Sequence, residues 1–109
     1  MNIFYVHLFH ILLVGSLFLY IGIQKTNIPN WFYPFLFGLG FFLIIYHSYK
    51  AYHYLLKGIN PWFNIIHIIL IAPLLIWIGY KKDKTPSYAF DLILMLGFAS
   101  IGYHTYYLF

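Results

Sequence analysis

The sequence contains no cysteine, no arginine and no glutamate, and its only charged residues are six lysines and two aspartates. Without cysteine the chain can form no disulfide, thiolate metal site or cysteine nucleophile. Without arginine, and with its lysines scattered, it has no basic cluster of the kind that binds nucleic acid. It also lacks a glycine-rich phosphate loop, a Ser-His-Asp set and paired carboxylates, so we do not expect a classical enzyme.

The residues that are present are mostly apolar. Of the 109 residues, 63% are hydrophobic, 25% are aromatic and 7% are charged. A soluble domain carries about a quarter charged residues, so this chain has too few to cover a surface exposed to water. The composition therefore predicts an integral, multi-pass membrane protein in contact with the lipid bilayer.

Four apolar stretches are long enough to cross a bilayer, which takes roughly 20 residues. They cover about residues 3–23, 31–56, 62–80 and 88–109, and short polar segments separate them. Pro73 falls inside the third stretch, where we expect it to kink the helix or to widen one turn. The predicted fold class is all-α, with four transmembrane helices in one four-helix bundle.

The second half of the sequence repeats the first. Residues 5–52 align without a gap with residues 62–109, and 15 of the 48 pairs are identical, including His10 with His67 and His47 with His104. This recurrence predicts a duplicated helical hairpin, with repeats at 1–56 and 57–109. Because each hairpin holds two spans, both copies enter the membrane from the same side. A pseudo-two-fold axis along the membrane normal would then relate them.

The lysines predict an orientation for these hairpins. The hairpin tips carry four lysines and the opposite side carries two, Lys50 and Lys57. By the positive-inside rule, the tips are expected in the cytoplasm and both termini outside.

Four histidines recur in register at the same depth. His10 and His67 lie early in the first and third spans, while His47 and His104 lie late in the second and fourth. Because alternate spans run in opposite directions, all four fall in the same half of the bilayer and form a predicted four-histidine layer. Ionisable groups at such depth are costly and more often functional than decorative.

The leading interpretation of the four-histidine layer is a ligand set for haem b or a transition metal ion, serving electron transfer or a redox relay. His10 with His67, or His47 with His104, would be the symmetry-related pairs. Gly40 and Gly97 lie two turns before a histidine and could border a porphyrin edge, although close helix packing explains them equally well. We expect neighbouring hydroxyl groups to orient the imidazoles; these are Tyr46, Ser48, Tyr49, Tyr103, Thr105 and Tyr106.

Two alternative functions are compatible with the same histidines. An oligomer could conduct protons or ions in a pH-sensitive manner, because histidine titrates near neutral pH. Asp91, His7 and His53 would then extend the pathway. The chain could also be a structural or accessory subunit whose histidines lie in the aromatic belt of the membrane interface. The expected partners are lipid together with further copies of the chain or a larger membrane complex.

Overall fold

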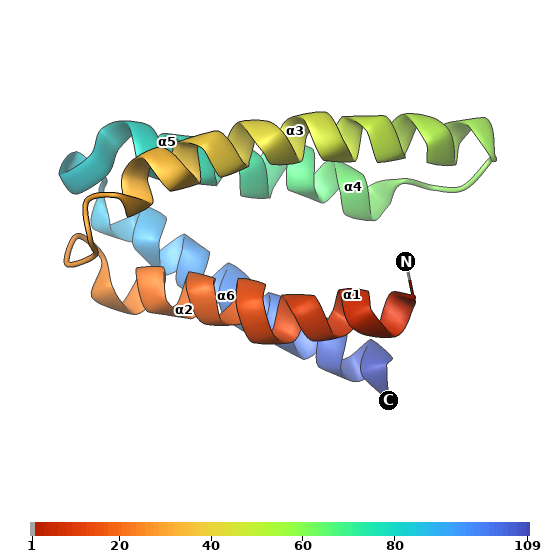
Figure 1. The fold of residues 1–109 in the computed structure, drawn as a ribbon, viewed down its shortest axis with the longest axis horizontal. Helices are drawn as coiled ribbons and strands as arrows, with labels where there is room; N and C mark the ends of the chain where they lie inside the picture. The colour runs from red at the N-terminus through yellow and green to blue at the C-terminus, as the bar shows by residue number, and fades with distance from the viewer. Residues whose placement is uncertain (1) are drawn as a thin grey trace. The chain divides into compact units, whose positions relative to one another are not determined.

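Four long helical segments make up the structure, a computed structural model that describes residues 2–109 (Figure 1). The first consists of α1 (Ile3–Phe9), the π-helical turn η1 (His10–Val14) and α2 (Gly15–Gln24). The second is α3 (Phe32–Leu56). The third consists of α4 (Trp62–Ile66), the π-helical turn η2 (His67–Ile71), α5 (Ala72–Lys81) and the short 3-10 helix η3 (Lys82–Lys84), and the fourth is α6 (Ser87–Leu108). No strand is present among these residues, so the all-α fold class is confirmed.

Three of the four segments are long and apolar enough to cross a membrane: Ile3–Gln24, Phe32–Leu56 and Trp62–Lys84. Their bounds lie within a few residues of those predicted from the apolar stretches. The helix α6 is also long, but it carries Ser87, Asp91, Ser100 and His104 among its apolar residues. Its crossing of the membrane therefore stays a prediction.

Local chemistry explains where the helices begin and end. The side chain of Asn2 accepts a hydrogen bond from the backbone N–H of Phe4 at 2.9 Å, which caps α1. Beyond α3, Gly58 has a φ of +71°, and the N–H of Ile59 returns to the carbonyl of Tyr54 at 2.9 Å. Only glycine adopts this left-handed conformation without strain, so Gly58 ends α3 cleanly.

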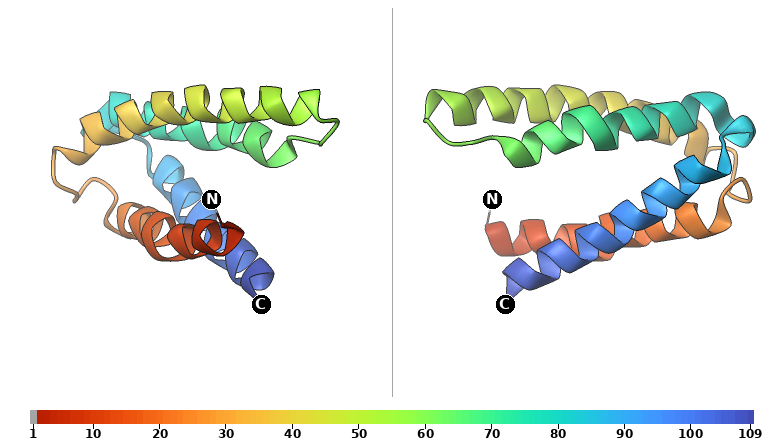
Figure 2. Two further views of the ribbon diagram at one scale, coloured as in Figure 1. Left: turned by 45° about the vertical axis from the view of Figure 1, so that its right-hand side comes forward. Right: turned by 180° about the vertical axis from the view of Figure 1, so that it is seen from behind.

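The chain forms two compact units, each built from two antiparallel helical segments. Unit 1 contains Met1–Ile28 and Pro86–Phe109, and in it α6 packs along α2, η1 and α1 (Figure 2). Unit 2 contains Pro29–Thr85, and in it α3 packs along α5, η2 and α4. The second and third spans are thus antiparallel neighbours, while the first span packs on the last. The repeats at 1–56 and 57–109 concern sequence recurrence and stay a prediction.

Glycines bring the two helices of each unit into close contact near the ends that carry the lysines. A Cβ on Gly79 would lie 2.6 Å from the backbone nitrogen of Phe37, and one on Gly22 would lie 2.5 Å from Leu94 Cβ. Either side chain would overlap the opposite helix. Small residues at these two positions, 57 residues apart, therefore set the helix separation.

Candidate functional site

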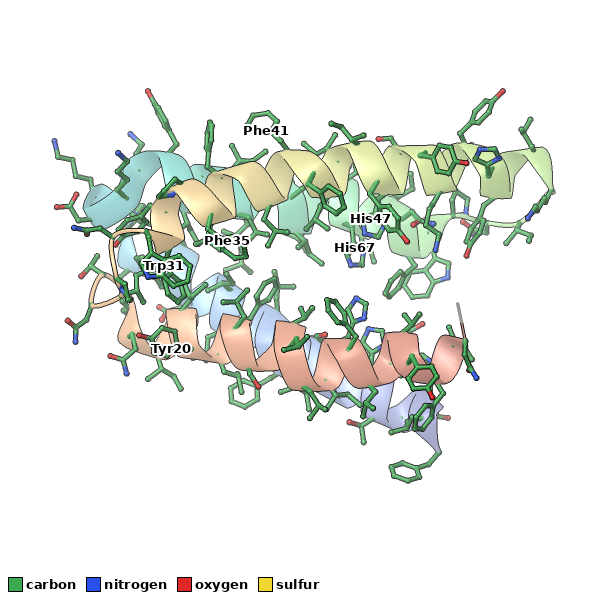
Figure 3. All side chains as sticks on the ribbon, in the orientation of Figure 1. Tyr20, Trp31, Phe35, Phe41, His47 and His67 are labelled. Carbon is green, nitrogen blue, oxygen red and sulfur yellow. The ribbon has the colours of Figure 1, made fainter. Side chains whose placement is uncertain are left out.

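Two histidines of unit 2 lie face to face. His47 comes from the second half of α3, and His67 is the first residue of η2. Their ring centroids are 4.1 Å apart and their planes differ by 20°. Both side chains are labelled in Figure 3. Only 8% of His47 and 7% of His67 is exposed. Unit 2 thus places two buried imidazoles in contact between its two helical segments.

Hydrogen bonds at Nδ1 fix the proton position on both rings. His67 Nδ1–H donates to the backbone carbonyl of Phe63 at 2.7 Å, and a carbonyl can only accept. His47 Nδ1–H donates to the side-chain oxygen of Asn64 at 2.8 Å. Asn64 is 3% exposed, so this second bond is buried. With Nδ1 protonated, the Nε2 atom of each neutral ring carries the lone pair.

Unit 1 holds a corresponding pair. The rings of His10 and His104 stack with their centroids 4.3 Å apart and their planes 21° apart. His10 Nδ1–H donates to the backbone carbonyl of Val6 at 2.7 Å. The Nδ1 atoms of His104 and His7 lie 2.8 Å apart, so one of them donates and the other accepts. The site in unit 1 therefore contains a third imidazole.

The two clusters occupy equivalent positions of the sequence repeat. His10, His104 and His7 in unit 1 correspond to His67, His47 and Asn64 in unit 2, at an offset of 57 residues. In both units two histidine rings stack, and Nδ1–H of the histidine that begins the π-helical turn donates to the backbone carbonyl four residues earlier. The clusters differ in one group, since the acceptor beside the α3 histidine is an amide and the group beside the α6 histidine is an imidazole.

A π-helical turn begins at the first histidine of each pair. The N–H of Gly15 bonds to the carbonyl of His10, and the N–H of Ala72 bonds to the carbonyl of His67. Pro73 lies two residues after the end of η2, so the widened turn predicted at this proline is observed. Ser16 holds the equivalent place in unit 1, so the proline is not necessary for the π-helix. Such turns are frequent at functional sites because they redirect one side chain without ending the helix.

Within the units, the ring contacts join His10 with His104 and His47 with His67. The symmetry-related pairs, His10 with His67 and His47 with His104, have one member in each unit and stay a prediction. His7 was assigned to an alternative proton pathway, and it instead contacts His104 directly. Asn64 was not predicted as a site residue at all. The signal in the sequence that could have identified Asn64 is its alignment with His7 at the offset of 57 residues.

The hydroxyl groups expected to orient the imidazoles do not supply the Nδ1 hydrogen bonds. Tyr46 and Tyr103 each place a ring edge-on against the next residue, with centroids 5.1 and 5.0 Å from His47 and His104. Tyr49 contacts His53 instead, at 4.3 Å. The others lie on partly or fully exposed positions, namely Ser48, Thr105 and Tyr106.

Gly40 and Gly97 face a neighbouring helix within their own units. A Cβ on Gly40 would lie 2.5 Å from Ile76 Cγ1, and one on Gly97 would lie 3.0 Å from Phe18 Cβ. These contacts are those of the helix-packing alternative, because the space beside each glycine is filled by protein. The porphyrin edge predicted at these glycines has no open strip there.

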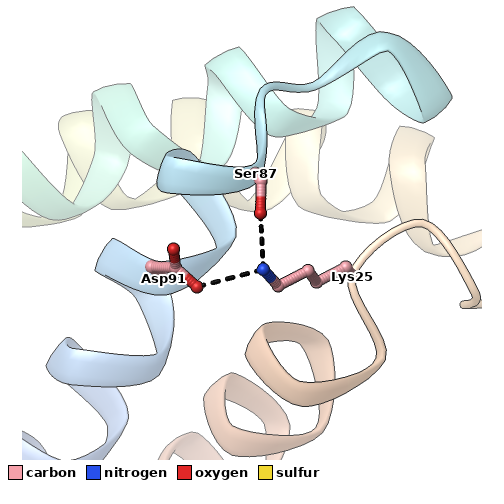
Figure 4. A network of polar contacts seen from close by, with 3 residues as sticks. All are labelled: Lys25, Ser87 and Asp91. Carbon is pink, nitrogen blue, oxygen red and sulfur yellow. Dashed lines mark hydrogen bonds and ion pairs between the residues drawn. The ribbon is translucent and has the colours of Figure 1, made fainter.

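Asp91 lies at the lysine-bearing end of unit 1. Its Oδ1 atom is 3.2 Å from the ammonium of Lys25, which also donates to the hydroxyl of Ser87 (Figure 4). Asp91 and His104 are 13 positions apart, which corresponds to about 20 Å of helix. Asp91 therefore ties α2 to α6 and lies far from the imidazoles.

Within residues 2–109, no three His, Cys, Asp or Glu side chains are arranged so that they could hold a metal ion. Each unit thus offers two stacked imidazoles and one further polar group as its candidate site. The chain matches no protein-family model, and neither curated proteins nor solved structures include a significant match.

Proposed function

We propose that the chain is an integral membrane protein. Three segments have the length and apolar character of membrane spans. Large apolar side chains are widely exposed on all the helical segments, including Ile45 at 71%, Ile69 at 68% and Met95 at 65%. Surfaces this apolar are favourable in contact with acyl chains and costly in water. The helix α6 is the fourth span of this proposal.

The recurrences 57 residues apart support a duplicated hairpin. The π-helical turns, the Nδ1 bonds to the preceding turn and the unusual φ of +55° at Lys25 and Lys82 all occur twice at that offset. We propose that two equivalent hairpins are related by a pseudo-two-fold axis along the membrane normal, with their lysine-bearing tips in the cytoplasm.

We propose that the histidine clusters bind a transition metal ion or haem b for electron transfer or redox relay. One observation carries this proposal: each of His10, His47 and His67 has its Nδ1–H bonded to an oxygen acceptor. Metal-ligating histidines almost always donate their second ring N–H to such a group, which holds the ring and directs the lone pair of the other nitrogen to the metal.

The stacked arrangement argues against a haem held between the two rings of one unit. The axial imidazoles of a haem lie on opposite faces of the porphyrin, so two rings in contact cannot both be axial ligands of one iron. Imidazole without thiolate or carboxylate suits zinc, copper, iron or nickel. A metal ion bound by two histidine nitrogens of one unit would keep further coordination positions open. An exogenous ligand could occupy them, or the ion could serve in electron transfer.

Metal content and absorption spectra of the detergent-purified protein test the proposal. We expect bound transition metal after incubation with Cu²⁺, Zn²⁺ or Fe²⁺, and its loss from unit 2 in His47→Ala and His67→Ala. His53→Ala is the matched control, because His53 lies on the same helix as His47 and contacts Tyr49 and Tyr52 instead. A Soret band lost with the same variants would identify haem. A colourless protein that takes up no metal would refute both the metal-ion and the haem form of the proposal.

A second candidate function is proton conduction by an oligomer. The observation in its favour is the 2.8 Å bond between the Nδ1 atoms of His7 and His104, which can pass a proton from one ring to the other. Proton flux into liposomes that His7→Asn abolishes would support this function, since asparagine is the group that unit 2 uses at that position. If neither flux nor metal binding is detected, the accessory-subunit alternative remains.

A further inference from the structure

A pocket of about 330 Å³ opens in unit 2 at the end that carries the lysines. Pro34 and Phe37 line it from the first two turns of α3, and Gly79, Tyr80 and Lys82 line it from the end of α5. The pocket is an open depression, and its volume lies at the lower end of the range of about 300–1,000 Å³ typical of small-ligand sites. The walls are largely apolar, and Lys82 contributes the positive charge.

The charge on Lys82 has no carboxylate partner. Lys25 and Asp91 form the one ion pair within 4.0 Å among residues 2–109. Lys25 is the equivalent of Lys82, and Pro34 occupies the position equivalent to Asp91. Unit 1 thus neutralises its lysine with a carboxylate, whereas unit 2 has a proline there and a pocket beside the ammonium. The pocket therefore suits an external anion.

Two helix ends border the pocket. The amino-terminal turns of α3 attract negative charge, whereas a helix carboxyl terminus such as that of α5 attracts positive charge. At the end of α5 the carbonyl of Ile78 is occupied, because it accepts hydrogen bonds from the N–H of Lys82 and from the hydroxyl of Thr85. Lys82 has a φ of +55°, which a glycine would adopt at lower cost.

We propose that this pocket binds the phosphate-bearing headgroup of an anionic membrane lipid. Lys82 would contact the phosphate, while Phe37, Pro34 and Tyr80 would contact the glycerol and the first methylenes of the acyl chains. The neighbouring charged residues Lys81, Asp83 and Lys84 together add one net positive charge to the same end of unit 2. A lipid is the favoured source because apolar and cationic groups meet in one pocket at the expected membrane surface. The inference rests on the proposed membrane location but not on metal binding.

Thermal stability of the full-length protein in neutral detergent, with added phosphatidylglycerol, tests this inference. We expect a rise in Tm that phosphatidylcholine and inorganic phosphate do not reproduce. Lys82→Gly removes the ammonium and relieves the strained φ, so it should fold while binding the anionic lipid about fivefold more weakly. Pro34→Asp copies the carboxylate of unit 1 and should weaken binding similarly, because aspartate is well tolerated in the first turn of a helix.

Lys84→Gln is the matched control, since it removes one charge from the same tip without touching the pocket. Equal losses in Lys84→Gln and Lys82→Gly would show that general surface charge, not the pocket, attracts the lipid, and would overturn the proposal. Stabilisation by inorganic phosphate alone would identify a free-anion site and also overturn it. Fractionation with membranes separates the two proposals: a membrane-bound chain without preference for anionic lipid fails only the present one.

Discussion

His47 and His67 stack 4.1 Å apart in the interior of unit 2, although 20 positions separate them in the sequence. The same contact joins His10 and His104 in unit 1, where the separation in sequence is 94 residues. Two histidine pairs with such different separations share one geometry because each is built by an antiparallel helix pair with a π-helical turn at the same place. The repeated geometry yields specific expectations for single substitutions.

Asn64→Leu should destabilise the protein by about 1–3 kcal/mol, since it leaves the Nδ1–H of His47 buried without its acceptor. Asn64→His should cost less, because an imidazole serves this position in unit 1. Adding His47→Phe to Asn64→Leu removes both polar groups and should recover most of the loss. Denaturation in detergent, followed by circular dichroism, measures all four proteins. Wild-type stability of Asn64→Leu would contradict the assigned bond.

The protonated nitrogen of each ring can be observed directly. In ¹⁵N-histidine NMR spectra at alkaline pH, His10, His47 and His67 should be neutral rings with hydrogen on Nδ1, because each faces an oxygen acceptor. His53, which makes ring contacts with tyrosines, is the internal comparison. Signals with hydrogen on Nε2 for His10 or His67 would be incompatible with the bonds to Val6 and Phe63.

Gly79→Ala should lower stability by about 1–3 kcal/mol, because the added methyl would lie 2.6 Å from backbone atoms of α3 and force the helices apart. Gly38→Ala is the matched control in the same unit, where nothing lies within 4 Å of the added Cβ. Alanine there should gain about 0.5–1 kcal/mol through its higher helix propensity. Thermal unfolding of both variants tests the contact, and equal effects would argue against it.

The ion pair between Lys25 and Asp91 should contribute little. Its side chains are 39% and 58% exposed, so water and salt screen the attraction. A double-mutant cycle with Lys25→Gln and Asp91→Asn should give a coupling free energy of about 0.2–1 kcal/mol that falls as salt is added. A coupling independent of salt would point to a buried pair instead.

The helix boundaries could be predicted from the sequence because local chemistry sets them. The polar segments that interrupt the apolar runs contain Pro29, Gly58 and Pro86, and the helical segments end a few residues before them, at Gln24, Leu56 and Lys84. The recurrence of His10 at His67 and of His47 at His104 was also visible, since identity at a fixed offset does not depend on folding. These features are properties of neighbouring residues or of the alignment.

The pairing of the spans was decided only by tertiary packing. All four segments are apolar, so hydrophobicity does not distinguish the partner of the first span. Close approaches at Gly22 and Gly79 place α2 on α6 and α3 on α5 within their units. This pairing put His10 beside His104 and gave Asn64 and His7 their roles at Nδ1. The sequence alone determined that histidines recur at one depth, whereas the contacts between helices decided which imidazoles meet, because the packing of small residues selects helix partners.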